Sequence, residues 1–125
     1  MSCPDPNHAA YLKGHALWKK QQFKEAALAF QVAIEEWPED YQALWTLGDC
    51  YTELKKPRQA ELAFRQALAV CADNDRVALT FNLGNALFDQ KLYAEAAALY
   101  DQIPRGHHLS RSARRNAFLA RERSA

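Results

Sequence analysis

Cysteine is scarce in this chain of 125 residues, and no two cysteines form a CxxC pair. The three that occur, Cys3, Cys50 and Cys71, are odd in number, which suits neither a disulfide framework nor a zinc site. We therefore expect reduced thiols. The neighbouring carboxylate of Asp49 would raise the pKa of the Cys50 thiol, so we interpret Cys50 as a small packing residue and not as a nucleophile.

Motifs of catalysis are also missing: the sequence has no glycine-rich phosphate loop, no GxSxG and no HExxH. His8 and His15 lie two turns apart on one expected helix face, but no third metal ligand has a suitable spacing. No stretch approaches the ~18 consecutive apolar residues of a membrane span, and the N-terminus has no basic-then-apolar signal pattern. We expect a cytoplasmic protein that is not an enzyme, with no cofactor, no metal and no membrane partner.

Net charge is small, at a formal +1, but the charges are unevenly distributed. Residues 1–104 carry ten Lys or Arg against fourteen Asp or Glu, whereas residues 105–125 carry six Arg against Glu122 alone. Six arginines could neutralise phosphates, yet Phe118 is the only aromatic residue of this tail that could stack on a base. Nucleic-acid binding is therefore a weaker hypothesis than solubility and pairing of the tail with the acidic body.

Glycine is rare as well, with four residues, and the spacing of three of them is informative. Gly14, Gly48 and Gly84 are 34 and 36 residues apart, and each follows an aromatic residue by three positions. Twelve positions after each glycine stands alanine and sixteen after it an aromatic residue: Ala26, Ala60 and Ala96, then Phe30, Phe64 and Tyr100. This period predicts helical hairpins in which small residues let two helices approach and large residues fill the space beside the crossing.

The period resembles the tetratricopeptide repeat, a 34-residue helix-turn-helix unit with the signature W-x2-L-G-x2-Y, then A-x3-F, an alanine and a proline. The second copy matches best, at Leu47, Gly48, Tyr51, Ala60, Phe64 and Ala67. Trp45 stands one position late, and Lys13 replaces the usual leucine of the first copy. The resemblance implies an all-α fold, a right-handed superhelical stack of three hairpins at about 7–38, 41–74 and 77–104.

Helix boundaries follow from capping residues and prolines. We expect helices near 6–20, 23–36, 41–54, 57–71, 76–90 and 93–102. Asp5 and Asp40 are predicted N-caps, and Pro6 and Pro57 stand in predicted first turns. Residues 72–76 are polar and are predicted to form a turn that is longer than its counterpart between the first two repeats.

The segment 105–125 is predicted to contain a seventh helix. One face of this helix would carry Leu109, Ala113, Ala117 and Ala120. Repeat arrays need a terminal element that covers the last apolar face, so we interpret the helix as a cap. A mobile basic tail and a partner-binding element are the alternatives.

In the family that the repeats resemble, the first helix of each hairpin lines a concave groove that binds partner peptides. The resemblance places these residues in the groove: Tyr11, His15, Trp18, Trp45, Asp49, Phe81, Asn85 and Phe88. Five of the eight are aromatic, which suits an extended or helical segment with apolar anchors. Packing of some of these rings between helices is the alternative.

The groove composition also bears on the kind of partner. A carboxylate clamp, which heat-shock co-chaperones use, would fall at Tyr11, His15, Thr46, Ala78 and Asn82, where only His15 could carry positive charge. Two-pronged recognition of an anion needs fixed cations, so no clamp is expected. We interpret the chain as an adaptor or chaperone for a protein or peptide ligand. A type III secretion-like chaperone of a translocator protein and a self-assembling scaffold, a homo-oligomer, are the alternatives.

Overall fold

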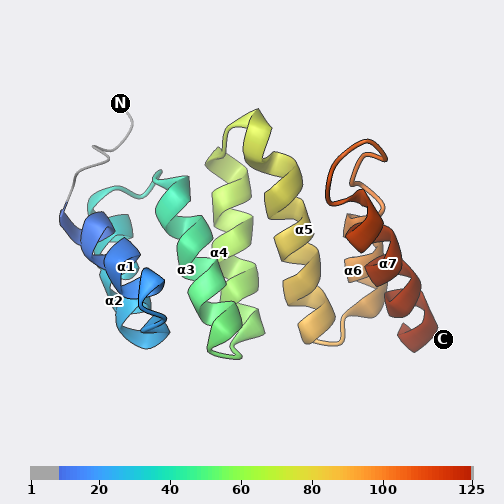
Figure 1. Cartoon of the computed structure of the whole chain (residues 1–125), viewed down its shortest axis with the longest axis horizontal. Helices are drawn as coiled ribbons and strands as arrows, with labels where there is room; N and C mark the ends of the chain where they lie inside the picture. Colours follow the sequence, from blue (N-terminus) through green and yellow to red (C-terminus); the bar gives the residue numbers. More distant parts are fainter. Residues whose placement is uncertain (1–8, 125) are drawn as a thin grey trace. The chain divides into compact units, whose positions relative to one another are not determined.

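The computed structural model describes residues 9–124, and all the regular elements in that range are α-helices (Figure 1). Their bounds are α1 Ala9–Lys19, α2 Phe23–Glu36, α3 Tyr41–Glu53, α4 Pro57–Val70, α5 Asp73–Asp89, α6 Tyr93–Tyr100 and α7 Ser110–Ser124. The expected helices over 23–36, 41–54 and 57–71 are thus confirmed to within one residue. Cys3, His8 and the predicted cap of Asp5 and Pro6 lie outside the described residues.

The chain divides into two compact units, one ending at Val70 and the other beginning at Cys71. In the first unit, α1 packs against α2 and α3 against α4, and α2 also packs against α3, so two antiparallel hairpins share one core (Figure 1). In the second unit, α5 packs against α6 and α6 against α7. Three helical hairpins and an added C-terminal helix therefore confirm the predicted all-α repeat architecture.

Each repeated glycine lies directly against the aromatic residue sixteen positions later. A Cβ atom added at Gly48 would stand 2.5 Å from the Phe64 ring, and one added at Gly14 would stand 2.9 Å from the Phe30 ring. Gly84 has the same relation to Tyr100, at 2.9 Å. The expectation of a close approach is confirmed, and its partner is now defined: the ring itself occupies the space that the missing side chain leaves.

The turns inside the three hairpins share a backbone feature. Gln21, Lys55 and Lys91 have φ between 61° and 67° and lie at the same 34- and 36-residue spacing as the glycines. In the first turn, the Gln21 N–H donates to the Trp18 carbonyl and the Gln22 N–H to the Leu17 carbonyl. This pair of bonds ends a helix by a Schellman motif, and Lys56 and Leu92 repeat the longer bond in the other two hairpins.

The predicted long turn at residues 72–76 is wrong, because α5 begins at Asp73. The two extra residues of this repeat lengthen the helix and not the loop. Asp73 and Asp75 stand in the first turn, where negative side chains interact favourably with the positive end of the helix dipole. The Asp40 cap is confirmed, since its carboxylate accepts a hydrogen bond of 3.1 Å from the Ala43 N–H.

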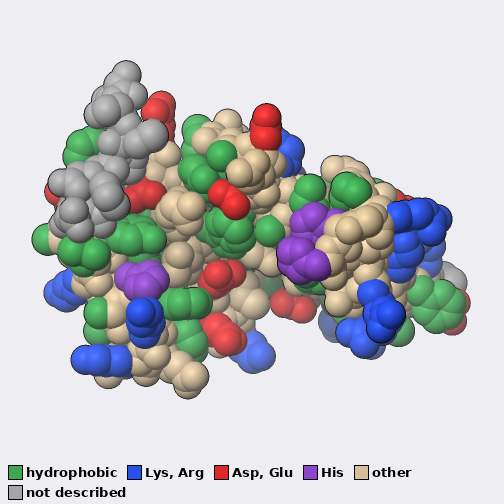
Figure 2. Space-filling view, turned by 45° about the horizontal axis from the view of Figure 1, so that its top comes forward, with side chains coloured by type: hydrophobic (Ala, Val, Ile, Leu, Met, Phe, Trp, Pro, Cys, Tyr) green, Lys and Arg blue, Asp and Glu red, His purple; other side chains and the backbone are tan. Residues whose placement is uncertain are grey.

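Helix α7 turns a face of small residues toward the second unit's core, where Ala113, Ala117 and Ala120 are fully or almost fully buried. Its opposite face is rich in arginine, and Figure 2 shows basic side chains gathered there. Arg121 forms an ion pair with Asp101 at the end of α6. The sequence-based expectation that the basic tail pairs with the acidic body is confirmed for this pair.

Candidate functional site

Three ring-bearing residues follow one another along α1 at the spacing of a single helix face. The rings of Tyr11 and His15 are stacked with centroids 6.1 Å apart, and those of His15 and Trp18 are 5.9 Å apart. The Tyr11 ring also meets the buried Phe30 ring edge-on, at 5.8 Å. Residues Tyr11, His15 and Trp18, which we term the α1 stripe, are all partly exposed, so the stripe is anchored on the core and still open to solvent.

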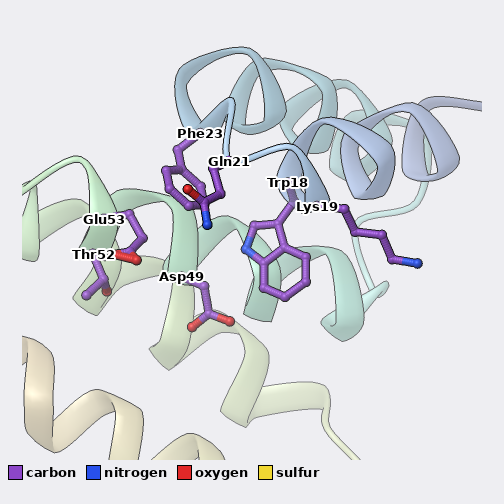
Figure 3. Close-up of a pocket in the computed structure, with 7 residues that line it drawn as sticks. All are labelled: Trp18, Lys19, Gln21, Phe23, Asp49, Thr52 and Glu53. Atoms are coloured by element: carbon purple, nitrogen blue, oxygen red, sulfur yellow. The ribbon is translucent and has the colours of Figure 1, made fainter.

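A pocket of about 570 Å³ lies beside the end of the α1 stripe. Its lining comes from the end of α1, the start of α2, the turn between them, and the last turns of α3: Trp18, Lys19, Gln21, Phe23, Asp49, Thr52 and Glu53 (Figure 3). The left-handed backbone at Gln21 brings the chain back so that Phe23 can begin α2 at the pocket's edge. We term this cavity the α1–α3 pocket.

The carboxyl groups of the α1–α3 pocket stand one turn apart on α3. Burial, and then the negative charge of Glu53, raise the pKa of Asp49 to about 6. Thr52 also lies in the lining, but its hydroxyl donates to the Gly48 carbonyl at 3.0 Å. The pocket therefore combines two aromatic walls with the partly buried carboxyl group of Asp49 and the exposed carboxyl group of Glu53.

Cys50, which adjoins Asp49, has a different environment. Its side chain is fully buried, and burial together with Asp49 and Glu53 raises the pKa of the thiol to about 12. A thiol with such a pKa holds almost no thiolate at neutral pH, and the thiolate is the nucleophile. The interpretation of Cys50 as a packing residue is confirmed.

The structure brings Trp18 and Asp49 together in the pocket, with Tyr11 and His15 beside them along α1. Trp45 is partly exposed on α3, one turn before Asp49. Thr46 stands at one of the positions that a carboxylate clamp would use, and its hydroxyl donates to the Gln42 carbonyl at 3.0 Å. The first unit thus presents a polar and aromatic face, and its pocket is lined by two carboxylates and one lysine.

The predicted groove residues of the second unit make contacts within that unit. The Phe81 and Tyr100 rings are 5.7 Å apart, and the Tyr100 hydroxyl donates to the Asn85 side-chain oxygen at 2.6 Å. Burial raises the pKa of Tyr100, although a hydrogen bond with Asn116 from α7 lowers it in part. Asn85 is therefore a partner of a buried phenol.

Phe88, the last residue of the predicted set, packs against two neighbours. The Tyr93 ring meets it edge-on at 5.2 Å, and the guanidinium carbon of Arg123 lies 5.0 Å from its ring centroid. This is the geometry of a cation–π contact between α7 and α5. The face of Phe88 therefore already binds an arginine of the same chain.

Sequence reasoning missed Gln21 and Phe23 as parts of a site, because it considered only the first helix of each hairpin. A usable pattern was present, since Phe23, Pro57 and Tyr93 all stand nine positions after a repeated glycine. Among the described residues, no group of three His, Cys, Asp or Glu side chains could hold a metal ion. Within the same range, none of the helices combines the length and the apolar character of a membrane span.

The repeats that these glycines mark are also found by comparison with known protein families. A family model described as Tetratricopeptide repeat matches residues 11–75 and again residues 53–107. The chain belongs to the tetratricopeptide repeat family. Protein HemY of Escherichia coli strain K12 is 34% identical to this repeat protein over 62 residues, which are 50% of the chain but 15% of HemY. The chain thus spans a small part of the curated relatives it matches.

Solved structures agree with the family assignment. The chain is similar in fold to the TPR2B domain in the pHsp70 complex of yeast Sti1, with a TM-score of 0.78 and 19% identity over 90% of this chain and 94% of that chain. It is also similar to the Yersinia enterocolitica type III secretion translocator chaperone SycD, with a TM-score of 0.72 and 14% identity over 92% of this chain and 81% of that chain. At such identities the likeness shows the fold and does not extend to the ligand.

Proposed function

We propose that this tetratricopeptide repeat chain is a non-enzymatic adaptor or chaperone whose α1 and α3 hold a segment of a partner protein. The observation that carries the proposal is the α1–α3 pocket at the end of the α1 stripe. Exposed aromatic side chains beside a pocket are typical anchors of protein interfaces, because they bury a large area at a low cost in side-chain entropy. Trp18 takes part in both features and is the proposed central anchor.

Trp45, Phe81, Asn85 and Phe88 belong to the same proposal as further contacts for the partner segment. Their support is the family register in the sequence and, for Trp45, partial exposure one turn from Asp49. The cytoplasm is the proposed location, because Cys50 is a buried cysteine without a disulfide bond and reduced cysteines are typical of that compartment.

Self-assembly is the second candidate function, favoured by one observation on α7. Phe118 is 62% exposed and adjoins Leu119, which is 37% exposed, so the outer side of α7 offers an apolar surface that a second copy could cover. The type III translocator chaperone reading has a likeness of fold as its support. Nucleic-acid binding is weaker, since Arg121 pairs with Asp101 and Arg123 lies over Phe88.

Selection of peptides from a random display library on the immobilised full chain tests the proposal. Replacing Trp18 and Trp45 together by alanine should reduce the affinity for the selected peptides at least ~10-fold, because tryptophan anchors contribute about 2 kcal/mol or more to binding. Leu28→Ala is the matched control, since Leu28 is an exposed apolar residue of α2 outside the pocket. Peptides that bind the double variant and the parent chain equally well, with circular dichroism unchanged, would refute the proposal.

A further inference from the structure

We infer that the α1–α3 pocket accepts a cationic side chain, arginine or lysine, from the bound segment. The inference rests on the proposed function and adds the chemistry of the ligand. Three features of the pocket carry it: the state of its two carboxylates, the position of its aromatic walls, and the placement of its one lysine.

The carboxylates of Asp49 and Glu53 lack partners within the described part of the chain. Neither makes a hydrogen bond or an ion pair with another residue in the range 9–124, although both line the cavity. By contrast, Asp40 at the start of the same helix caps a backbone N–H, and Asp101 pairs with Arg121. A partly buried carboxylate beside an exposed one, both bordering the cavity and neither with a partner in that range, favours a ligand that supplies positive charge and N–H donors.

The walls of the pocket fit the rest of a basic side chain. Trp18 and Phe23 stand on either side of the space that Asp49 and Glu53 border (Figure 3). The face of an indole attracts a guanidinium or an ammonium group, and its apolar surface packs against the methylene stem behind that group. Arg123 on Phe88 shows, within this chain, an arginine bound to an aromatic ring of a first helix.

Lys19 is the one basic side chain among the seven lining residues. It is exposed, and Figure 3 shows its ammonium group directed away from Asp49 and Glu53, with the Trp18 indole between them. It therefore leaves the carboxylates unneutralised. The charged form of Asp49 also lowers the stability of the fold, since burial disfavours it. Retention of such a group in a pocket is typical of a binding site, where stability is lost in favour of function.

The test uses the full chain labelled with ¹⁵N and two small probes, N-acetyl-arginine methylamide and the citrulline derivative of the same shape. Citrulline replaces the charged guanidinium by a neutral urea. The arginine probe should shift the Trp18 indole N–H and the Asp49 and Glu53 amides saturably at neutral pH. Citrulline should bind at least ~10-fold more weakly, because a hydrogen bond between ions is roughly twice as strong as one between neutral groups.

Variants locate the effect. Asp49→Asn with Glu53→Gln should reduce affinity for the arginine probe at least ~10-fold, as expected when both anionic acceptors are removed. Glu35→Gln with Glu36→Gln is the matched control, because it removes the same charge from an exposed stretch of α2 and should leave the affinity unchanged. Lys19→Gln should leave binding unchanged or strengthen it.

Equal shifts with arginine and citrulline, no shift with either, or unchanged binding to the Asp49/Glu53 double variant would each overturn the inference. Binding lost equally in the Glu35/Glu36 control would also do so, since it would reflect net charge alone. The pocket would instead bind an arginine of a second copy if the chain forms a dimer and two results hold. The double variant Arg111→Gln with Arg115→Gln would abolish the dimer, and dilution would remove the shifts. Library peptides whose binding requires Trp18 and Trp45 but which carry no basic residue would overturn the inference of a cationic ligand and leave the proposed function intact.

Discussion

Gly48 lies directly under the ring of Phe64, so closely that a Cβ atom at residue 48 would stand 2.5 Å from the ring. Both residues are buried, and Phe64 is 2% exposed. The same relation links Gly14 to Phe30 and Gly84 to Tyr100, at 2.9 Å in each case. The tightest of the three contacts is therefore in the repeat that matches the family signature best.

Gly48→Ala should destabilise the chain, although alanine favours the helix by about 1 kcal/mol over glycine. The added methyl would overlap a ring that is itself packed on all sides, and overpacking of this kind typically costs about 1–3 kcal/mol. We expect a net loss of about 1 kcal/mol or more in urea denaturation. The control is Gly106→Ala, because a Cβ there meets nothing within 4 Å. Equal stability of the two variants would contradict the packing argument.

The Tyr100 hydroxyl is predicted to stabilise the second unit. Tyr100→Phe leaves the partly buried Asn85 oxygen and Asn116 without their phenol partner, which should cost about 1 kcal/mol. Tyr93→Phe is the comparison, since the Tyr93 ring packs on Phe88 but its hydroxyl has no hydrogen bond among the residues described. Thermal unfolding of both variants measures the difference. A larger loss in Tyr93→Phe would contradict the assignment.

Helix positions could be predicted from the sequence because two periodic features fix them independently. Glycine and the aromatic residue sixteen positions later set the register of each hairpin, and Asp40 and Pro57 set where helices begin. The start of α5 was not predictable in the same way. Asp73 and Asp75 are typical both of a polar turn and of a helical first turn, so local composition does not decide between them.

The pocket was only half predictable. Trp18 and Asp49 follow from the family register, because both stand on first helices at positions where the sequence predicts a groove. Phe23 and Gln21 reach the pocket through the left-handed turn that joins α1 to α2, and a lysine or glutamine at that position does not mark such a turn in a sequence. The raised pKa of Asp49 depends on burial in three dimensions, which residue spacing does not give.

Replacing a left-handed residue of a hairpin turn by glycine is expected to increase the stability of the chain. Lys55 has φ of 61°, a conformation that crowds any residue with a Cβ atom. Lys55→Gly should stabilise the first unit by about 0.5–1 kcal/mol, because glycine is the preferred residue after a helix C-cap. Lys56→Gly, one position later and outside the left-handed region, should bring no gain. The urea midpoints of the two variants measure the gain. Equal shifts would show that the added backbone flexibility of glycine, and not the φ angle of residue 55, causes the change in stability.

The contribution of Asp49 to the free energy of unfolding is expected to depend on pH. Its pKa is about 6 in the folded chain and 3.8 in the unfolded chain, so the unfolded state loses the proton first as pH rises. The stability that the protonated carboxyl contributes is complete below about pH 4 and is lost by about pH 6. Asp49→Asn should match the parent chain near pH 3.5 and exceed it by up to about 3 kcal/mol at pH 7.

Two other residues of the pocket lining also carry charge: Glu53 on the same helix, and Lys19 at the end of α1, whose ammonium group is directed away from Asp49 (Figure 3). Glu35→Gln is therefore the control, because this exposed carboxylate of α2 lies away from both. Urea denaturation at several pH values should show a difference for Asp49→Asn that grows between pH 4 and 6 and then levels. A difference independent of pH would show that the amide acts by packing. A less stable variant at pH 7 would mean that the Asp49 carboxylate has a stabilising partner, and the argument for an unneutralised acid in the pocket would fail with it.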